Sequence, residues 1–208
     1  MIKIGIDVGS TTAKLVAVDE NDNLLFSKYE RHNAKAKETI LSFLKELLSE
    51  IGDKDISVRI TGSIGMGISE KCSLPFVQEV VAAAKAIQKD YSHVTSMIDI
   101  GGEDAKVVFF KDAEATDLRM NGNCAGGTGA FIDQMAIILG VNIDELNQLA
   151  MNATQVYPIA SRCGVFCKTD IQNLIAKNVS RENIAASIFR AVAVQTVVTL
   201  AHGCDITT

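Results

Sequence analysis

Near its start the chain reads Gly5-Ile6-Asp7-Val8-Gly9-Ser10-Thr11-Thr12-Ala13-Lys14. An apolar run ends here on a carboxylate, and one glycine with three hydroxyl residues separates it from a second apolar run. This pattern predicts two strands joined by a tight turn. Such a turn offers backbone N–H groups and hydroxyls to a phosphate, whereas Asp7 suits the magnesium that accompanies a nucleotide. The candidate nucleotide-binding residues of this segment are Asp7, Gly9, Ser10, Thr11, Thr12 and Lys14.

A second segment repeats the arrangement and reads Asp99-Ile100-Gly101-Gly102-Glu103-Asp104-Ala105-Lys106. One acidic-glycine turn at a strand end is usually an ordinary turn, but a matched pair is far more specific. Two such turns facing each other would hold a triphosphate from both sides. The further candidate nucleotide-binding residues are Asp99, Gly101, Gly102 and Lys106. Asp99 would share the magnesium with Asp7. If the bound nucleotide is hydrolysed, Asp104 or Glu103 is the candidate for orienting the attacking water.

The segments around the two turns follow the same order, which indicates a weak internal duplication. In the first half we expect strands at 3–8, 13–18, 24–31 and 56–61, a glycine-rich turn into a short helix at 62–67, and helices at 34–51 and 77–89. In the second half we expect strands at 96–100, 105–110 and 115–120, and helices at 125–139, 169–177 and 181–202. The chain then divides into subdomains 1–92 and 93–208.

Composition and charge exclude several classes of protein. The 208 residues are 48% hydrophobic and 22% charged, which is typical of a globular protein with a real core. The net charge of −5 argues against nucleic-acid binding, which usually requires a basic surface. No apolar stretch at the start resembles a signal peptide, and the apolar run at 191–201 is shorter than the about 20 residues that span a bilayer. We expect a cytoplasmic protein that does not enter a membrane.

A glycine-rich segment surrounds Cys124 and reads Asn121-Gly122-Asn123-Cys124-Ala125-Gly126-Gly127-Thr128-Gly129-Ala130-Phe131. Its glycines let the backbone approach a ligand closely, and it opens into a predicted helix whose N-terminus favours an anion. Cys124 lies just ahead of that terminus, where a thiolate would be stabilised. The residues expected to close over the nucleotide phosphates are Gly126, Gly127, Thr128 and Gly129.

A second cysteine beside a glycine, Cys163, also precedes a predicted helix, in the segment 161–170. An iron–sulfur cluster with thiolate ligands is an anion and normally takes four cysteines. One chain supplies two well-placed cysteines, and two identical chains around a two-fold axis would supply four. Two alternatives stay open at this point. The cysteines could be buried structural thiols, or Cys163 and Cys167 could form half of a zinc site or a redox pair, although no nearby residue completes a tetrahedral set.

These motifs together resemble a known family. The paired acidic-glycine turns look like the phosphate-1 and phosphate-2 motifs of the actin/Hsp70/sugar-kinase superfamily, whose α/β fold is a duplicated ribonuclease H-like unit. The segments I-D-V-G-S-T-T, D-I-G-G-E-D-A-K, N-C-A-G-G-T-G-A-F and S-R-C-G-V-F are similar to those of the ATP-dependent activators of 2-hydroxyacyl-CoA dehydratases and the ATPase subunits of benzoyl-CoA reductase. The resemblance covers essentially the whole chain.

The resemblance implies a homodimer that shares one [4Fe–4S] cluster through Cys124 and Cys163. It implies ATP and Mg²⁺ as further cofactors, and a low-potential electron passed to a 2-hydroxyacyl-CoA dehydratase-type iron–sulfur enzyme when ATP is hydrolysed. A ferredoxin or flavodoxin would supply the electron. Since Gly126–Gly129 and Cys124 share one short stretch, the phosphate state and the surroundings of the cluster would be coupled by covalent connection.

Three features depart from the family pattern. Cys167 is an extra cysteine beside the ligand motif, and Glu103 stands where many relatives have glutamine. The family's later adenosine-binding segment and final strands are not found after Thr208 in this sequence. Several short segments of the sequence look most like those of the long multidomain members. We therefore expect an incomplete second half. Two rival functions use the same phosphate motifs: a small-molecule kinase, which needs a carboxylate base beside a hydroxyl substrate, and a non-catalytic nucleotide-binding module.

Overall fold

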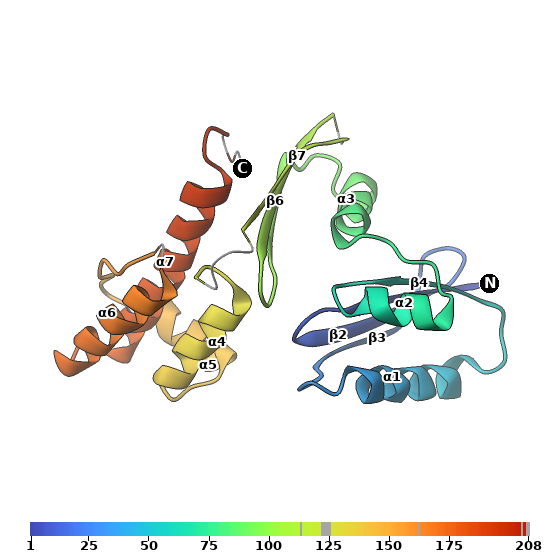
Figure 1. The fold of residues 1–208 in the computed structure, drawn as a ribbon, viewed down its shortest axis with the longest axis horizontal. Helices are drawn as coiled ribbons and strands as arrows, with labels where there is room; N and C mark the ends of the chain where they lie inside the picture. Colours follow the sequence, from blue (N-terminus) through green and yellow to red (C-terminus); the bar gives the residue numbers. More distant parts are fainter. Residues whose placement is uncertain (113, 122–125, 162, 205, 207–208) are drawn as a thin grey trace. The chain divides into compact units, whose positions relative to one another are not determined.

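The computed structural model describes residues 1–112, 114–121, 126–161, 163–204 and 206. They form two compact units, Met1–Asp90 and Tyr91–Thr208, and each unit has its own sheet (Figure 1). Cys124 and Arg162 lie outside the described residues. The assignment of the two halves to ribonuclease H-like subdomains stays a prediction.

The sheet of the first unit has the strand order β3-β2-β1-β4. Its strands are β1 (Ile2–Val8), β2 (Thr12–Val18), β3 (Leu24–Arg31) and β4 (Ile56–Thr61). The first three strands run antiparallel to their chain neighbours, and β4 lies parallel to β1. Every second residue of β1 is buried, from Ile2 to Val8. One face of β1 therefore belongs to the core, which brings the turn after Val8 to the end of a well-packed central strand.

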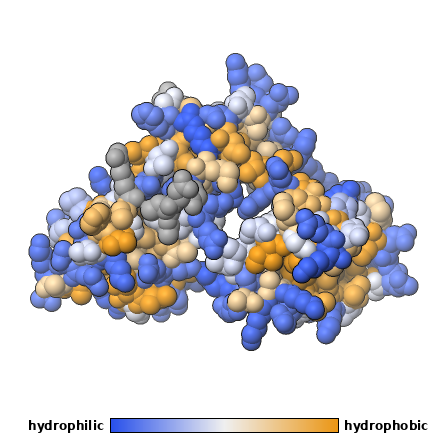
Figure 2. Space-filling model, viewed as in Figure 1, coloured by the Kyte–Doolittle hydropathy of each residue, from blue (hydrophilic) through white to orange (hydrophobic). Residues whose placement is uncertain are grey.

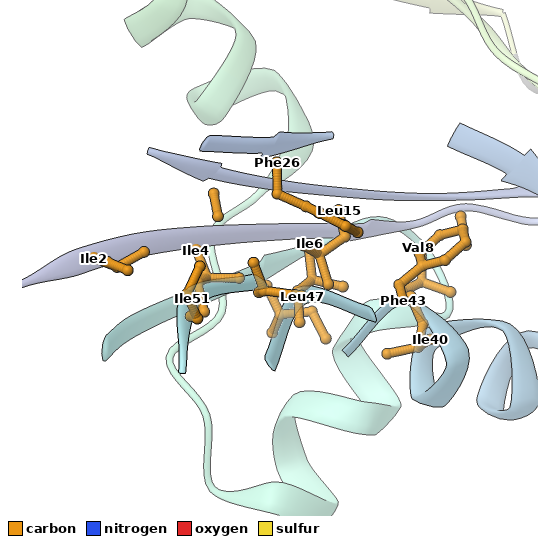
Figure 3. Packing of buried hydrophobic residues seen from close by; sticks show 13 residues of the cluster. Ile2, Ile4, Ile6, Val8, Leu15, Phe26, Ile40, Phe43, Leu47 and Ile51 are labelled. Carbon is orange, nitrogen blue, oxygen red and sulfur yellow. The ribbon is translucent and has the colours of Figure 1, made fainter. Parts of the chain in front are cut away.

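Helix α1 (Ala36–Ile51) covers that face of the sheet. Its buried residues recur three or four positions apart, which places them on one side of the helix. They are Ile40, Phe43, Leu47 and Ile51. Figure 3 shows these side chains against the isoleucines of β1. The sequence predicted a helix at 34–51, and the structure confirms it with a start at Ala36.

Two short helices complete the first unit. Helix α2 (Gly65–Cys72) follows β4, and α3 (Glu79–Asp90) ends the unit without a buried residue. Asp22, in the β2–β3 hairpin, receives hydrogen bonds from Lys89 and Lys3. Hydrogen bonds from these two ammonium groups lower the pKa of Asp22 to about 2, and the bond from Lys89 has the larger effect. The ion pair between Lys89 and Asp22 thus attaches the end of α3 to the hairpin.

The sheet of the second unit is antiparallel, in the order β5-β6-β7. Its strands are β5 (Ser96–Ile100), β6 (Ala105–Lys111) and β7 (Glu114–Asn121). Six consecutive residues of β6 are buried, 105–110, so this strand is covered on both faces. The end of helix α7 packs on Ala105, Val107 and Phe109. Arg119 of β7 reaches the same helix end, where its guanidinium donates to the carbonyls of Leu200 and His202.

Four helices form the main core of the second unit. They are α4 (Gly129–Ile138), α5 (Ile143–Met151), α6 (Gly164–Ala176) and α7 (Arg181–Leu200). Helix α7 is long and apolar enough to cross a membrane by length and composition alone. Of its most apolar 18 residues, 56% are buried inside the unit, and core helices pass the same test. Figure 2 shows orange apolar side chains scattered among hydrophilic ones on the surface that it displays.

The strands of the second unit lie where they were predicted, but three helices differ. Helix α4 begins at Gly129 rather than at 125, because Thr128 supplies the N-cap. Helix α5 was not predicted, although Asn142 and Glu145 form a capping box at its start. Helix α6 begins at Gly164 rather than at 169, so that Cys163 itself is the N-cap residue.

Two adjacent leucines of α1 allow a matched test of the first core. Leu47 is fully buried, whereas Leu48 is 54% exposed. We expect Leu47→Ala to lower the free energy of unfolding by about 2–5 kcal/mol, because it leaves a cavity between α1 and the sheet. Leu48→Ala should change it by about 0.5 kcal/mol or less. Urea denaturation measures both, and equal losses for the two variants would contradict the packing described for α1.

Candidate functional site

The turn between β1 and β2 is built to present backbone donors. The N–H of Gly9 closes the turn by donating to the carbonyl of Thr12 at 3.0 Å. Among the described residues, no acceptor is found for the N–H groups of Ser10 and Thr11. Both residues are only partly buried. The turn therefore offers two adjacent, accessible N–H groups, which is the arrangement that binds an oxyanion such as phosphate.

Asp7, at the end of β1, has one paired and one unpaired carboxylate oxygen. Its Oδ2 lies 2.9 Å from Nζ of Lys14, which is its cross-strand partner on β2. Its Oδ1 is buried and has no hydrogen-bond partner within the described part of the chain, and the same holds for Oγ1 of the neighbouring Thr61 on β4. An unpaired carboxylate oxygen is the kind of ligand that magnesium takes, directly or through water. The residues present at this strand end thus fit a magnesium ion.

Gly62 lets the loop after β4 approach this carboxylate. Its φ of +91° lies in the left-handed region, and a Cβ atom there would be 2.6 Å from Oδ1 of Asp7 and 2.4 Å from the carbonyl oxygen of Val8. Any other residue would displace the carboxylate or the end of β1. The sequence predicts a glycine-rich turn at Gly62, but no local pattern connects this turn with Asp7.

The turn between β5 and β6 repeats this geometry 92 residues further along the chain. Asp99 and Lys106 are cross-strand partners, as Asp7 and Lys14 are. Lys106 is buried, and its Nζ lies 3.0 Å from Oδ2 of Asp104 and 3.9 Å from Oδ2 of Asp99. The ammonium group therefore holds the two carboxylates in place. Glu103, the other candidate for orienting water, is exposed in this turn.

Two backbone hydrogen bonds join this second turn to the start of α4. The N–H of Gly129 donates to the carbonyl of Gly101 at 2.8 Å, and the N–H of Ala130 donates to the carbonyl of Gly102 at 3.0 Å. A Cβ atom on Gly129 would lie 3.0 Å from the same Gly101 oxygen. These two amides at the helix start are thus occupied by the protein itself. They hold the β5–β6 turn against α4 as one body.

The glycine-rich turn ahead of α4 packs against α7. Gly127 has a φ of +89°, and a Cβ atom there would lie 2.9 Å from Cγ of Gln195. Gln195 is 6% exposed, and its Oε1 is buried without a partner among the described residues. Gly126, Gly127 and Thr128 are themselves buried. The sequence held no local signal for this contact, because Gln195 lies in a long apolar helix.

Cys163 is the N-cap residue of α6, with an extended backbone and no hydrogen bond from its side chain to the helix. A Cβ atom on Gly164 would lie 3.5 Å from the ring of Phe131, in the first turn of α4, and 3.8 Å from the amide nitrogen of Gly126. The start of α6 therefore lies beside the glycine-rich turn, two residues along the chain from Cys124. The sequence predicted Cys163 six residues ahead of a helix, but the structure places it at the helix start itself. A partly buried thiol at that position is close to the backbone N–H groups that stabilise negative charge, and so it suits an anionic metal cluster better.

Cys167 occupies a different environment one turn further along α6. Its side chain is 1% exposed and belongs to the core around α4 and α7. Burial, followed by the nearby Asp170 carboxylate, raises the pKa of this thiol to about 11. Cys167 is thus a small core residue and a poor candidate for a second thiolate ligand. Among the described residues, no group of three or more His, Cys, Asp or Glu side chains could hold a metal ion.

Comparison with known proteins gives a consistent result. Residues 4–205 match the family model described as the BadF/BadG/BcrA/BcrD ATPase family. The 2-hydroxyisocaproyl-CoA dehydratase activator of Clostridioides difficile is 31% identical over 206 residues, which cover 93% of this chain and 73% of the relative.

Two solved structures are similar over nearly all of the chain. The crystal structure of the Acidaminococcus fermentans (R)-2-hydroxyglutaryl-CoA dehydratase component A matches with a TM-score of 0.89 and 27% identity, covering 100% of this chain and 80% of that one. The activator of the 2-hydroxyisocaproyl-CoA dehydratase from Clostridium difficile, with bound ADPNP, matches with a TM-score of 0.83 and 30% identity, covering 93% and 72%. The predicted α/β fold class of actin, Hsp70 and sugar kinases is thereby confirmed.

The contact between Gly127 and Gln195 can be tested against a second left-handed glycine. Gly140 has a φ of +66°, but no atom lies within 4 Å of a Cβ placed there. Gly140→Ala should therefore cost only the backbone strain, about 1–2 kcal/mol of unfolding free energy. Gly127→Ala should cost about 1–3 kcal/mol more, because its methyl group also overlaps Gln195. Equal losses of unfolding free energy for the two variants, measured by urea denaturation, would contradict the close contact between Gly127 and Gln195.

Proposed function

The chain belongs to the BadF/BadG/BcrA/BcrD ATPase family, and we propose that it hydrolyses ATP to drive one-electron transfer to a 2-hydroxyacyl-CoA dehydratase-type iron–sulfur enzyme. The electron would pass through a [4Fe–4S] cluster shared by two copies of the chain. The observation that carries this proposal is the pair of hydrogen bonds between the β5–β6 turn and the start of α4. They link a candidate phosphate-binding turn to the start of α4, which follows Cys124 in the chain and lies beside Gly164, the residue after Cys163.

We assign nucleotide binding to the two acidic-glycine turns. The free N–H groups and hydroxyls of Ser10 and Thr11 would bind phosphate oxygens, and Thr12 closes their turn. Asp7 and Asp99 would complete the magnesium shell, while Asp104 or Glu103 would orient the water. The relative with bound ADPNP supports a nucleotide as the ligand of this fold. Lys14 and Lys106 act through the carboxylates that they pair with, Asp7 in one turn and Asp99 and Asp104 in the other.

Cys124 and Cys163 of each copy would hold the cluster, which when bound accepts and releases single electrons at low potential. Cys163 presents its thiol at the start of a helix, whose N–H groups stabilise the negative charge of thiolates and of the group they bind. The next two exposed residues are apolar: Val165 is 72% exposed and Phe166 66%. One chain supplies two of the four ligands, and exposed apolar side chains lie beside one of them. A second copy of the chain would both supply the other two ligands and cover these apolar side chains.

Coupling between the two sites would run through contacts of the second unit. A phosphate that moves the Gly101–Gly102 turn must move the first residues of α4, because their N–H groups donate to that turn. Phe131 of α4 lies against the start of α6 at Gly164. A displacement of α4 therefore reaches the backbone beside Cys163. Hydrogen bonds and backbone dipoles around a cluster set its reduction potential, so this displacement would tune electron release.

The partners follow from this reaction. A ferredoxin or flavodoxin would donate one electron per cycle, and the acceptor would be an iron–sulfur enzyme of the kind that the named relatives activate. We place this exchange between soluble proteins in the cytoplasm, with neither nucleic acid nor membrane involved.

Iron analysis tests the assignment of the cluster. The chain purified without oxygen should contain about four iron atoms per pair of chains and show the broad brown absorbance of a [4Fe–4S] cluster. Cys163→Ala and Cys124→Ala should each abolish both signals. Cys72→Ala is the control, because Cys72 is an exposed thiol in the other unit. If both ligand variants keep the iron and the absorbance of the wild-type chain, the cluster assignment is wrong.

Hydrolysis tests the assignment of the nucleotide site. Asp7→Asn should lower the rate of ATP hydrolysis at a fixed Mg²⁺ concentration by about 10- to 100-fold, as expected when an oxygen that supports a metal ion is lost. Asp22→Asn is the matched control, because Asp22 also pairs with lysines in this unit but lies in the β2–β3 hairpin. The rate of the control should stay at the wild-type value. A wild-type rate for Asp7→Asn would remove Asp7 from the site.

A further inference from the structure

His32 is a buried histidine attached to the turn between β1 and β2. Its side chain is 4% exposed, and its Nε2 lies 3.1 Å from the carbonyl oxygen of Gly9. Its backbone N–H donates to the carbonyl of Thr11 at 3.2 Å. His32 thus contacts the phosphate-binding turn twice from inside the unit. We propose that His32 is a positioning residue for phosphate binding, an inference that rests on the nucleotide site proposed above.

The hydrogen bond to Gly9 determines which nitrogen of the imidazole carries a hydrogen atom. A carbonyl oxygen can only accept, so Nε2 must carry the proton and donate to Gly9. Nδ1 is buried and has no partner in the part of the chain that the structure describes. An unsatisfied ring nitrogen lowers stability, and an apolar residue of the same shape would avoid this loss. The histidine is therefore better explained by its action on the turn than by packing.

The carbonyl of Gly9 determines where the next N–H points. The Gly9–Ser10 peptide bond is trans, as all peptide bonds of the described chain are. In a trans peptide the C=O and the N–H point in opposite directions. Because His32 draws the Gly9 oxygen toward the inside of the unit, the Ser10 N–H is directed outward. Without this donor the peptide could rotate and present an oxygen, which repels phosphate, in place of a donor.

In the second turn, the carbonyl that corresponds to that of Gly9 also accepts a hydrogen bond. Gly101 is the counterpart of Gly9, and its oxygen accepts a hydrogen bond from the N–H of Gly129 at 2.8 Å. In one turn the first glycine carbonyl is held by a helix start, and in the other by an imidazole. His32 therefore does for the first turn what the Gly129 amide does for the second.

The loop that carries His32 is held in an uncommon conformation. The two residues after it, Asn33 and Ala34, have φ values of 47° and 63°, and the N–H of Lys35 donates to the His32 carbonyl at 2.7 Å. Two successive left-handed residues without glycine are unfavourable. They turn the chain sharply between β3 and α1, directly after the residue that contacts Gly9.

Substitution by side chains with and without a donor tests the proposal. His32→Phe keeps the ring but removes the donor, and it should weaken binding of Mg·ADPNP by about 10- to 100-fold, the effect of a lost hydrogen bond to a charged group. His32→Gln places an amide donor near the position of Nε2 and should restore affinity to within about threefold. Ser69→Ala is the control, since it removes another buried side-chain donor of this unit, to the Leu74 carbonyl at 2.6 Å. It should lower stability and leave affinity unchanged.

Calorimetric titration with Mg·ADPNP gives the affinities, and ¹⁵N spectra of the histidine rings give the tautomer without nucleotide. We expect His32 to be protonated at Nε2 and not at Nδ1 in the wild-type chain. Wild-type affinity in His32→Phe, or a ring protonated at Nδ1 alone, would overturn the proposal. If the wild-type chain binds no Mg·ADPNP, the proposed function fails, and so does a role for His32 in phosphate binding; the ring spectrum then still decides whether its contact with Gly9 exists.

Discussion

The hydrogen bonds from Gly129 and Ala130 to the carbonyls of Gly101 and Gly102 constrain most of the second unit. They use N–H groups that a helix start normally leaves for solvent or an anion. These hydrogen bonds therefore couple the position of the β5–β6 turn to that of the start of α4. The contacts of Phe131 with Gly164 and of Gly127 with Gln195 extend this body to α6 and α7. A local event at the turn thus has a short mechanical path to the Cys163 thiol.

The two acidic-glycine turns share a strand register but are held by different means. In the first unit a side chain, His32, binds the turn, whereas in the second a helix start does so. In the second turn the carbonyls of Gly101 and Gly102 accept directly from the first residues of α4. Under the proposed function, a phosphate bound at this turn would therefore displace α4, and both candidate cysteines belong to this second unit.

The sequence predicted what depends on short-range patterns. The strands and α1 follow apolar periodicity. The pairs of Asp7 with Lys14 and of Asp99 with Lys106 were not predicted, because both lysines were assigned to the nucleotide. Helix α5 was missed because it is short and follows Gly140 and Asn142, which read as a loop. The start of α6 was missed because Gly164 and Val165 are poor helix formers. His32 and Gln195 lie far along the chain from the turns they contact, and no local pattern marks such contacts.

Cys163 and Cys167 show why position on a helix decides the role of a thiol. They are four residues apart, and the N–H of Cys167 donates to the Cys163 carbonyl at 2.9 Å. The N-cap position turns the first side chain out of the helix, beside unpaired N–H groups that stabilise negative charge. One turn later, Cys167 points into an apolar core, and this burial raises the pKa of its thiol. A four-residue spacing of cysteines, which resembles half of a metal site in sequence, therefore yields one candidate ligand and one core residue. In the proposed cluster the remaining ligands would come from Cys124 and from a second chain, so the proposal of a cluster and the proposal of a dimer depend on each other.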